Sequence, residues 1–391
     1  MIQKASINVA TVQSILNQFH IASNNLHVNH VVEQLKNCRT KALGYHLYKC
    51  TDDSCLKYKY QYHSCRNRHC PQCGSLQKDQ WIEDRMTELL PINYYHVVFT
   101  LPHELNSINL GHRSILFNLL FNAASQTLLE FAKTPKHLGA IPGILAILHT
   151  WGQQLSFHPH VHCIVSGGGI LKAEDQFHWR NASRNKDDFL FPVKAMAIVF
   201  RGKYLHGLKK LLVESTISSP PGLDTKELFN LLYSKDWVVY AKKPFGGPQQ
   251  VIEYLGRYTH KVAISNHRIN SINSANKTVT FEYKDYSDQN QIKQMTLHAD
   301  EFIRRFEQHI LPKHFTKIRS YGYLSNRNRK SNIALIQISL QLPLHPDKVK
   351  TPWNVRLAEK HKIDYSLCPH CKQSTLVLLV IQYKNGKFSD A

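Results

Sequence analysis

The segment His-Pro-His-Val-His at residues 158–162 carries three imidazoles within five positions. Apolar residues after it favour a β-strand, in which alternate side chains share a face. His160 and His162 therefore project to the same side, whereas Val161 and Ile164 are expected to point to the core. Two imidazoles held on one strand provide half of a divalent-metal site.

A third ligand for this metal must come from nearby in the fold. If Gly143–Trp151 and Pro159–Ser166 form a hairpin, His149 lies across from His162 and shares its face. Mg²⁺ or Mn²⁺ suits a site that also carries phosphate oxygen, although imidazole ligands bind Co²⁺ or Zn²⁺ tightly as well. His149 is the preferred third ligand, and the other local candidates are Gln153, Gln154 and His158.

Tyr254 and Tyr258 are four residues apart, so on a helix they lie on one side. Gly256 between them costs a helix roughly 1 kcal/mol relative to Ala, which indicates a close approach at this position. A free tyrosine has a pKa near 10 and is a poor nucleophile until a cation stabilises its phenolate. Taken alone, such a pair is more often core packing. Basic side chains crowd the same region: Arg257, His260, Lys261, His267 and Arg268.

Six of the nine cysteines fall within residues 38–73. Disulfides are disfavoured in a reducing cytosol, so zinc binding is a better interpretation than disulfides or buried free thiols. Close cysteine pairs in tight loops supply the four tetrahedral ligands that structural zinc needs. The preferred set is Cys50, Cys55, Cys70 and Cys73.

Cys38, Cys65 and His69 are left over and could serve a second zinc site. Cys368 and Cys371 could complete such a site, with Cys38 or across a dimer, because two ligands alone do not close one.

Basic and aromatic side chains alternate around these cysteines, a pattern that suits phosphate contact and base stacking. A solvated charged face is the alternative interpretation. The basic residues include Arg66 and Arg68, and the aromatic residues are Tyr45, Tyr48, Tyr58, Tyr60 and Tyr62.

The charge of the whole chain points to a polyanionic partner. Its 391 residues carry 49 Lys and Arg against 28 Asp and Glu, a formal charge of +21. Such a surplus attracts nucleic acid, because phosphate binding releases condensed counterions. No apolar run approaches the ~20 residues that span a bilayer, and the N-terminus lacks the apolar core of a signal peptide. We therefore expect a cytoplasmic protein with no membrane partner.

The order of strand and helix patterns predicts an α+β fold, an antiparallel sheet with helices packed on it. We divide the chain into a zinc-binding, DNA-contacting domain (1–90), a catalytic domain (91–270) and a basic accessory region (271–391). Expected strands are 94–101, 143–151, 159–166 and 237–242, with further short strands in 263–298. Expected helices are 76–90, 111–131, 193–213, 249–260 and 300–310; residues 332–341 fit either state, and 167–190 are expected to form a polar insertion.

Several motifs in order make the chain resemble the two-tyrosine HUH transposases of rolling-circle insertion sequences, the insertion sequence ninety-one family. The resemblance implies an HUH catalytic domain preceded by a small Cys-rich zinc domain. In it, His160 and His162 match the histidine pair, and Tyr254 and Tyr258 match the two tyrosines. The motifs are CRNRHCPQC at 65–73, FTLPHEL at 99–105, LHTWGQ at 148–153, HPHVHCIVSGGG at 158–169, EYLGRYTHKVAISNHRI at 253–269, and FIRRFEQHILP with IRSYGYLSNRNR at 302–329.

The function that the resemblance implies is nicking and strand transfer of single-stranded DNA at transposon ends. A tyrosine attacks phosphorus beside the metal, which withdraws charge as a Lewis acid, and leaves a 5′-phosphotyrosine and a free 3′-hydroxyl. One alternative is a metal-dependent hydrolase that activates water; another is a zinc-containing DNA-binding regulator without catalysis, which gives no role to the histidines and tyrosines. Expected DNA contacts are Arg66, Arg68, Arg257, Lys261 and Arg268.

Overall fold

The structure is a computed structural model. It describes residues 10–86, 88–173, 176–182, 190–242, 250–251, 262–344, 366–373 and 375–390, with Tyr254, Gly256 and single residues between 352 and 364. The chain forms two compact units: Met1–Gly74 joins Pro346–Ala391, and Ser75–His345 forms the other. These units differ from the segments expected with boundaries at residues 90 and 270, because the C-terminal strand pairs with an N-terminal one.

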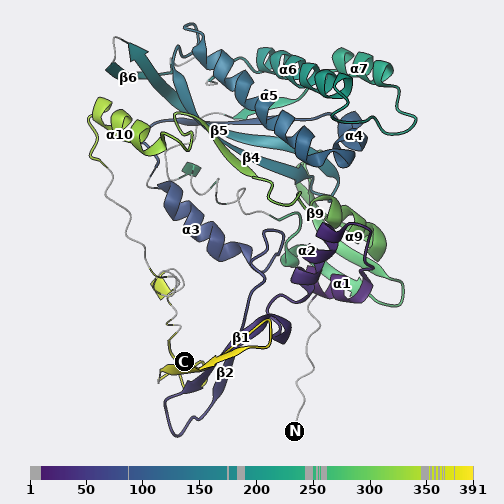
Figure 1. Cartoon of the computed structure of the whole chain (residues 1–391), viewed down its shortest axis with the longest axis vertical. Helices are drawn as coiled ribbons and strands as arrows, with labels where there is room; N and C mark the ends of the chain where they lie inside the picture. Colours follow the sequence, from purple (N-terminus) through teal and green to yellow (C-terminus); the bar gives the residue numbers. More distant parts are fainter. Residues whose placement is uncertain are drawn as a thin grey trace. The chain divides into compact units, whose positions relative to one another are not determined.

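The larger unit is built on a six-stranded sheet in the order β11-β4-β5-β3-β7, with β6 paired to β5 (Figure 1). Every pairing in it is antiparallel, which confirms the expected α+β class. The segment expected as a polar insertion instead continues β5 into a hairpin with β6. The strands are β3 (Tyr94–Thr100), β4 (Ile141–Trp151), β5 (Phe157–Ala173), β6 (Gln176–Asn181), β7 (Val239–Lys242) and β11 (Ile318–Gly322).

Helices α5 and α6 cover one face of this sheet and enclose the main core (Figure 1). Val161 of β5 and Phe99 of β3 are fully buried there against apolar side chains of the helices. By length and composition α5 is also apolar enough to cross a membrane, but its apolar side chains are used in this core. The helices of this unit are α3 (Gly74–Met86), α4 (Asn106–Gly111), α5 (Arg113–Lys133), α6 (Val193–Val213), α7 (Thr225–Ser234), α9 (Ala299–Gln308) and α10 (Arg329–Ser339).

The opposite face of the sheet carries the histidines. Side chains at 160, 162 and 164 share this face because strand residues alternate. The expectation that Ile164 points the same way as Val161 is therefore wrong: Ile164 lies in a second cluster with Leu145, Ile147 and Tyr254, away from the main core.

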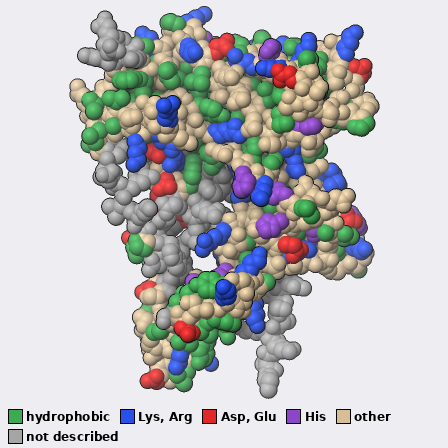
Figure 2. Space-filling model, viewed as in Figure 1, with side chains coloured by type: hydrophobic (Ala, Val, Ile, Leu, Met, Phe, Trp, Pro, Cys, Tyr) green, Lys and Arg blue, Asp and Glu red, His purple; other side chains and the backbone are tan. Residues whose placement is uncertain are grey.

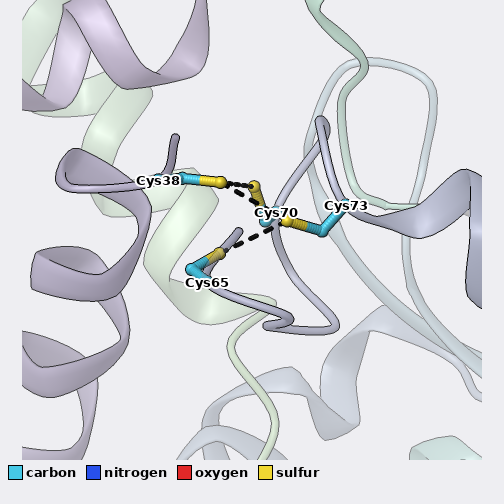
Figure 3. Close-up of side chains that lie close together, drawn as sticks. All are labelled: Cys38, Cys65, Cys70 and Cys73. Atoms are coloured by element: carbon cyan, nitrogen blue, oxygen red, sulfur yellow. Dashed lines mark hydrogen bonds between the residues drawn. The ribbon is translucent and has the colours of Figure 1, made fainter. Parts of the chain in front are cut away.

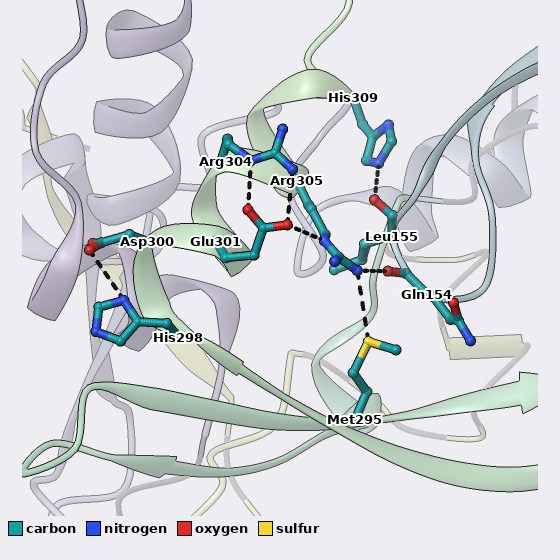
Figure 4. Close-up of polar contacts among 9 residues, drawn as sticks. All are labelled: Gln154, Leu155, Met295, His298, Asp300, Glu301, Arg304, Arg305 and His309. Atoms are coloured by element: carbon teal, nitrogen blue, oxygen red, sulfur yellow. Dashed lines mark hydrogen bonds and ion pairs between the residues drawn. The ribbon is translucent and has the colours of Figure 1, made fainter. Parts of the chain in front are cut away.

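A three-stranded antiparallel sheet and helix α9 hold the turn between β4 and β5 (Figure 4). Arg305 of α9 donates to the carbonyl of Gln154 at 3.0 Å, and His309 contacts the carbonyl of Leu155 at 3.1 Å. Leu155 has a positive φ of 58°, so this turn adopts a conformation that needs external support. The strands are β8 (Ile269–Asn273), β9 (Thr278–Asp285) and β10 (Gln291–His298).

In the part of the smaller unit that the structure describes, helices α1 and α2 accompany a four-stranded sheet in the order β13-β12-β1-β2. Strand β12, near the end of the chain, runs antiparallel to β1, with Gly44 opposite Tyr383 and Cys50 opposite Leu376. The tail expected to belong to the accessory region therefore completes this sheet. Its elements are α1 (Val12–Phe19), α2 (Leu26–Lys36), β1 (Gly44–Cys50), β2 (Tyr58–Tyr62), β12 (Leu376–Tyr383) and β13 (Phe388–Asp390).

The clamp on the β4–β5 turn can be tested with two neighbouring arginines. Arg304 and Arg305 both pair with Glu301, and Arg305 in addition donates to the Gln154 carbonyl in the turn. We expect Arg305→Ala to lower the free energy of unfolding by roughly 1.5–3 kcal/mol, the usual worth of a hydrogen bond from a charged group. The control Arg304→Ala, an exposed pair, should cost roughly 0.5 kcal/mol or less. Urea denaturation measures both, and equal losses would contradict the clamp.

Candidate active site and cysteine clusters

Three imidazoles from neighbouring strands converge on the face of the sheet opposite the main core. The ligand atoms of His149, His160 and His162 all lie within 4.8 Å of one another. The hairpin has the expected form, but its register places His149 directly opposite His160 and diagonal to His162. His149 and His162 are buried and His160 is partly exposed, so the group is accessible from one side. The alternative His158 is not part of this group. The side chain of Gln153, another alternative, donates instead to the hydroxyl of Tyr286 at 3.0 Å.

A hydrogen bond to the backbone occupies one ring nitrogen of His160 and leaves the other for a cation. Its Nδ1 lies 2.6 Å from the carbonyl of His158, to which it donates, so Nε2 is the atom that can bind a cation. The His149 ring is stacked on Trp151, with centroids 4.8 Å apart, which fixes its plane. Three imidazoles on two neighbouring strands, two of them buried, fit a divalent cation.

His96 is a further residue at the candidate site, and the sequence did not reveal it. It lies on β3, is 2 % exposed, and its Nε2 is 2.9 Å from Nδ1 of His162. Burial, and then the positive charge of Lys242, lowers the pKa of His96 to about 3, so it is neutral at physiological pH. A partner of this kind fixes the tautomer and ring orientation of a metal-binding histidine. A single histidine in an apolar strand gives no sequence signal for this role.

The hydroxyl of Tyr254 meets His96 from the helical segment on the same face. It lies 2.9 Å from Nε2 and 3.0 Å from Nδ1 of His96, and the two rings are 4.7 Å apart. Tyr254, His96 and His162 thus form a continuous series of polar contacts. Residues 250, 251, 254 and 256 are helical, as expected for 249–260. The other expected site residues of this segment, Tyr258, Arg257 and Lys261, lie outside the described residues.

The cysteines of the smaller unit separate into two groups of four. The first is Cys38, Cys65, Cys70 and Cys73 (Figure 3). Its sulfur atoms are 3.4–3.6 Å apart in the three contacts that link it. A tetrahedral zinc with Zn–S bonds near 2.3 Å requires sulfurs about 3.8 Å apart, close to these values.

The second group is Cys50, Cys55, Cys368 and Cys371. The preferred set of Cys50, Cys55, Cys70 and Cys73 therefore took two members from each group and does not form one site. The physical reason is the sheet: β1 carries Cys50 to the end where the C-terminal cysteines lie, whereas α2 carries Cys38 to the loop of Cys65–Cys73.

The arginines expected to contact DNA have different surroundings. Arg66 and Arg68 are exposed on the loop between Cys65 and Cys70. Arg268 instead donates to the backbone carbonyls of Gln153 at 2.5 Å and Glu282 at 2.7 Å. We interpret Arg268 as a residue that positions the β4–β5 turn.

Known protein families match both the cysteine-rich N-terminal region and the region that carries the histidines. A family model described as "Putative transposase" matches residues 143–332, and one described as "Transposase zinc-binding domain" matches residues 10–101. The "Putative transposase y4qJ" of Sinorhizobium fredii is 40% identical over 362 residues, 90% of this chain and 88% of that protein. The "Transposase for insertion sequence element IS801" of Pseudomonas savastanoi pv. phaseolicola is 32% identical over 306 residues, 76% of this chain and 70% of that protein.

Two solved structures of TrwC show a distant likeness. One, complexed with a 27-mer DNA that comprises the recognition hairpin and the cleavage site, has 11% identity and a TM-score of 0.23, over 42% of this chain and 71% of that one. The other is the metal-bound conjugative relaxase in complex with oriT DNA, with 8% identity and a TM-score of 0.26, over 62% of this chain and 96% of that one.

The identity of the third ligand can be tested by comparing His149 with His158. We expect His149→Ala to weaken Mn²⁺ binding by more than the roughly 10–100-fold that loss of an outer partner of a ligand costs. His158→Ala keeps the backbone carbonyl that His160 contacts, so its affinity should stay near that of the unchanged protein. Isothermal titration with Mn²⁺ measures both, and the reverse order would assign the ligand to His158.

Proposed function

Because the chain belongs to the insertion sequence ninety-one family of transposases, we propose that it cuts DNA with Tyr254 beside a divalent cation held by three histidines. It is a rolling-circle transposase, an HUH-type endonuclease that nicks DNA and transfers strands. The observation that carries the assignment of residues is the placement of the Tyr254 hydroxyl and the three imidazoles on one face of one sheet.

His149, His160 and His162 would hold the cation. Bound there, it supplies Lewis-acid stabilisation of charge on the scissile phosphate. The partly exposed side at His160 is where substrate has access. Mg²⁺ or Mn²⁺ is the proposed ion, because it would have to bind phosphate oxygen as well as the imidazole nitrogens.

Tyr254 is the proposed nucleophile. Its phenolic oxygen loses its proton and forms a bond to phosphorus while the bond from phosphorus to the 3′-oxygen breaks. The 3′-oxygen takes up one proton, so protons balance, and the 5′-phosphate stays on the tyrosine. His96 is neutral and holds the hydroxyl within hydrogen-bond distance, so it orients the phenol before attack. Tyr258 is proposed as the second nucleophile, which lets the enzyme retain one DNA end while it cuts another strand.

Single-stranded DNA at the ends of the transposon is the proposed substrate, and the smaller unit offers a surface for it. Tyr58, Tyr60 and Tyr62 alternate along β2 and are 53%, 52% and 42% exposed. The rings of Tyr60 and Tyr62 are stacked, with centroids 6.1 Å apart. Lys49 pairs with Tyr58 across the strands, and Figure 2 shows Lys and Arg side chains, with a few acidic ones, beside hydrophobic side chains over β1 and β2.

Exposed aromatic rings with nearby cations suit unpaired bases, which stack on them while phosphates meet the cations. Arg66 and Arg68 on the neighbouring cysteine loop would add phosphate contacts, as would Arg257 and Lys261 near Tyr254. We place the activity in the cytoplasm, where reducing conditions keep the clustered thiols available for zinc.

The nucleophile is tested with a single-stranded oligonucleotide that carries the end of the element, incubated with Mn²⁺. The unchanged protein should form a covalent adduct that denaturing electrophoresis resolves. We expect Tyr254→Phe to reduce adduct formation strongly, and the double change of Tyr254→Phe with Tyr258→Phe to abolish it. Tyr233→Phe, an exposed tyrosine of α7, is the matched control and should behave as the unchanged protein.

Two outcomes would overturn this assignment. An adduct that persists in the double variant would place the nucleophile elsewhere. Nicked DNA with a free 5′-phosphate and no adduct in the unchanged protein would favour the metal-dependent hydrolase.

The stacking surface gives a separate prediction for DNA binding. Loss of one stacked base costs roughly 1–3 kcal/mol, so Tyr60→Ala should weaken binding to single-stranded DNA by about 5- to 150-fold. Tyr60→Phe keeps the aromatic face and should bind nearly as tightly as the unchanged protein. Fluorescence anisotropy at one fixed salt concentration measures both. Equal losses in the two variants would show that the hydroxyl, not the ring, matters.

A further inference from the structure

Four cysteines from opposite ends of the chain lie together at one end of the smaller sheet. Cys50 and Cys55 flank the turn after β1, and Cys368 and Cys371 lie in the turn before β12. The Sγ atoms are 3.7 Å apart between Cys50 and Cys371, and 3.9 Å apart between Cys55 and Cys368. The matched zinc-binding domain ends at residue 101, so it does not include two of these four residues.

We infer that this group binds a second zinc ion, separate from the one expected at Cys38, Cys65, Cys70 and Cys73, and that the ion joins the two ends of the chain into one unit.

The sulfur geometry fits a single tetrahedral ion. Four thiolates around one zinc, with bonds near 2.3 Å, lie about 3.8 Å apart, which both measured contacts match. A disulfide would need sulfurs only about 2.05 Å apart, well below the 3.7 and 3.9 Å of these two pairs. Four sulfurs in a tetrahedron select zinc over the oxygen-preferring cations.

The turn after β1 is shaped to present its cysteines. The N–H of Asp52 lies 3.5 Å from Sγ of Cys50, a contact that stabilises a thiolate. The Asp52 carboxylate accepts from the N–H of Ser54 at 2.8 Å, and the Asp52 carbonyl accepts from the N–H of Cys55 at 3.0 Å. The chain then passes through Leu56 with a φ of 44°, which reverses its direction. Such contacts around ligands orient them before the metal binds.

The C-terminal turn also combines a backbone hydrogen bond with a positive φ, and a further hydrogen bond joins it to the turn after β1. The Lys372 N–H donates to the carbonyl of Cys368 at 2.9 Å, and Lys372 has a φ of 60°. The N–H of Thr51 donates to the carbonyl of Thr375 at 3.0 Å, which continues the β1–β12 pairing into the two turns. Main-chain hydrogen bonds therefore bring the two cysteine pairs together.

The sheet also needs a crosslink of this kind, because it buries little. Among the described residues of its four strands, only Gly44 and Cys50 are fully buried. A sheet with so small an apolar core is marginal in water unless a metal or disulfide supports it. In structural zinc sites the free energy of metal binding is in effect folding free energy.

The test is the zinc content of the full-length protein, measured by mass spectrometry of the metal against protein from amino-acid analysis. The unchanged protein should hold two zinc ions per chain. Cys368→Ser with Cys371→Ser should hold one, and so should Cys65→Ser with Cys70→Ser from the other group. Cys163→Ala, which removes the ninth cysteine outside both groups, is the control and should keep two.

Cobalt substitution gives a readout that does not depend on the variants folding well. The unchanged protein loaded with Co²⁺ should show the visible absorption of tetrahedral cobalt–thiolate sites at two ions per chain. Titration with a mercurial reagent should release two zinc ions as eight thiols react. One zinc ion in the unchanged protein, two in the Cys368 and Cys371 variant, or iron in place of zinc would overturn the inference.

Discussion

The alternation of side chains along β4, β5 and β3 is the constraint on which the active site depends. Val161 points into the core beneath α5 and α6, and its neighbours His160 and His162 point to the opposite face. A slip of one residue in the pairing of β5 would move both imidazoles into the core and Val161 to the surface. The same apolar burial that stabilises the sheet therefore fixes which histidines can meet a cation.

Alternation decides which face a histidine is on, but it does not fix the position of β4 along β5. A second set of contacts, at the turn between the two strands, helps to fix that position. The turn that joins β4 to β5 is held through its backbone carbonyls by Arg268, Arg305 and His309. All three come from later in the chain than the strands they hold. The accessory segment around β8–β10 thus contacts the turn that joins the two histidine strands, and Arg268, which was expected to contact DNA, donates to a carbonyl of this turn.

Local patterns predicted most of this fold. Strand β4, strand β3 and helix α6 lie within two residues of their expected bounds, since each carries its own apolar period. What depended on distant parts of the chain was not predicted. Strand β11 is short and basic, and only its pairing with β4 makes it a strand. His96 gains its role from the neighbouring strand, and the grouping of the cysteines depended on β12 pairing with β1 across almost the whole chain.

The two units are stabilised in different ways, and this difference bears on how each contacts DNA. The larger unit buries aromatic side chains such as Phe99, Phe117 and Phe121 completely, so apolar packing supports the sheet that carries the histidines. The sheet of the smaller unit leaves Tyr58, Tyr60 and Tyr62 of β2 exposed instead of using them as a core. If cysteine-bound metal supplies the missing stability, those rings remain free to stack on bases. A sheet that is stabilised by metal can thus keep aromatic side chains on its surface for a ligand, because it does not need them in a core to remain folded.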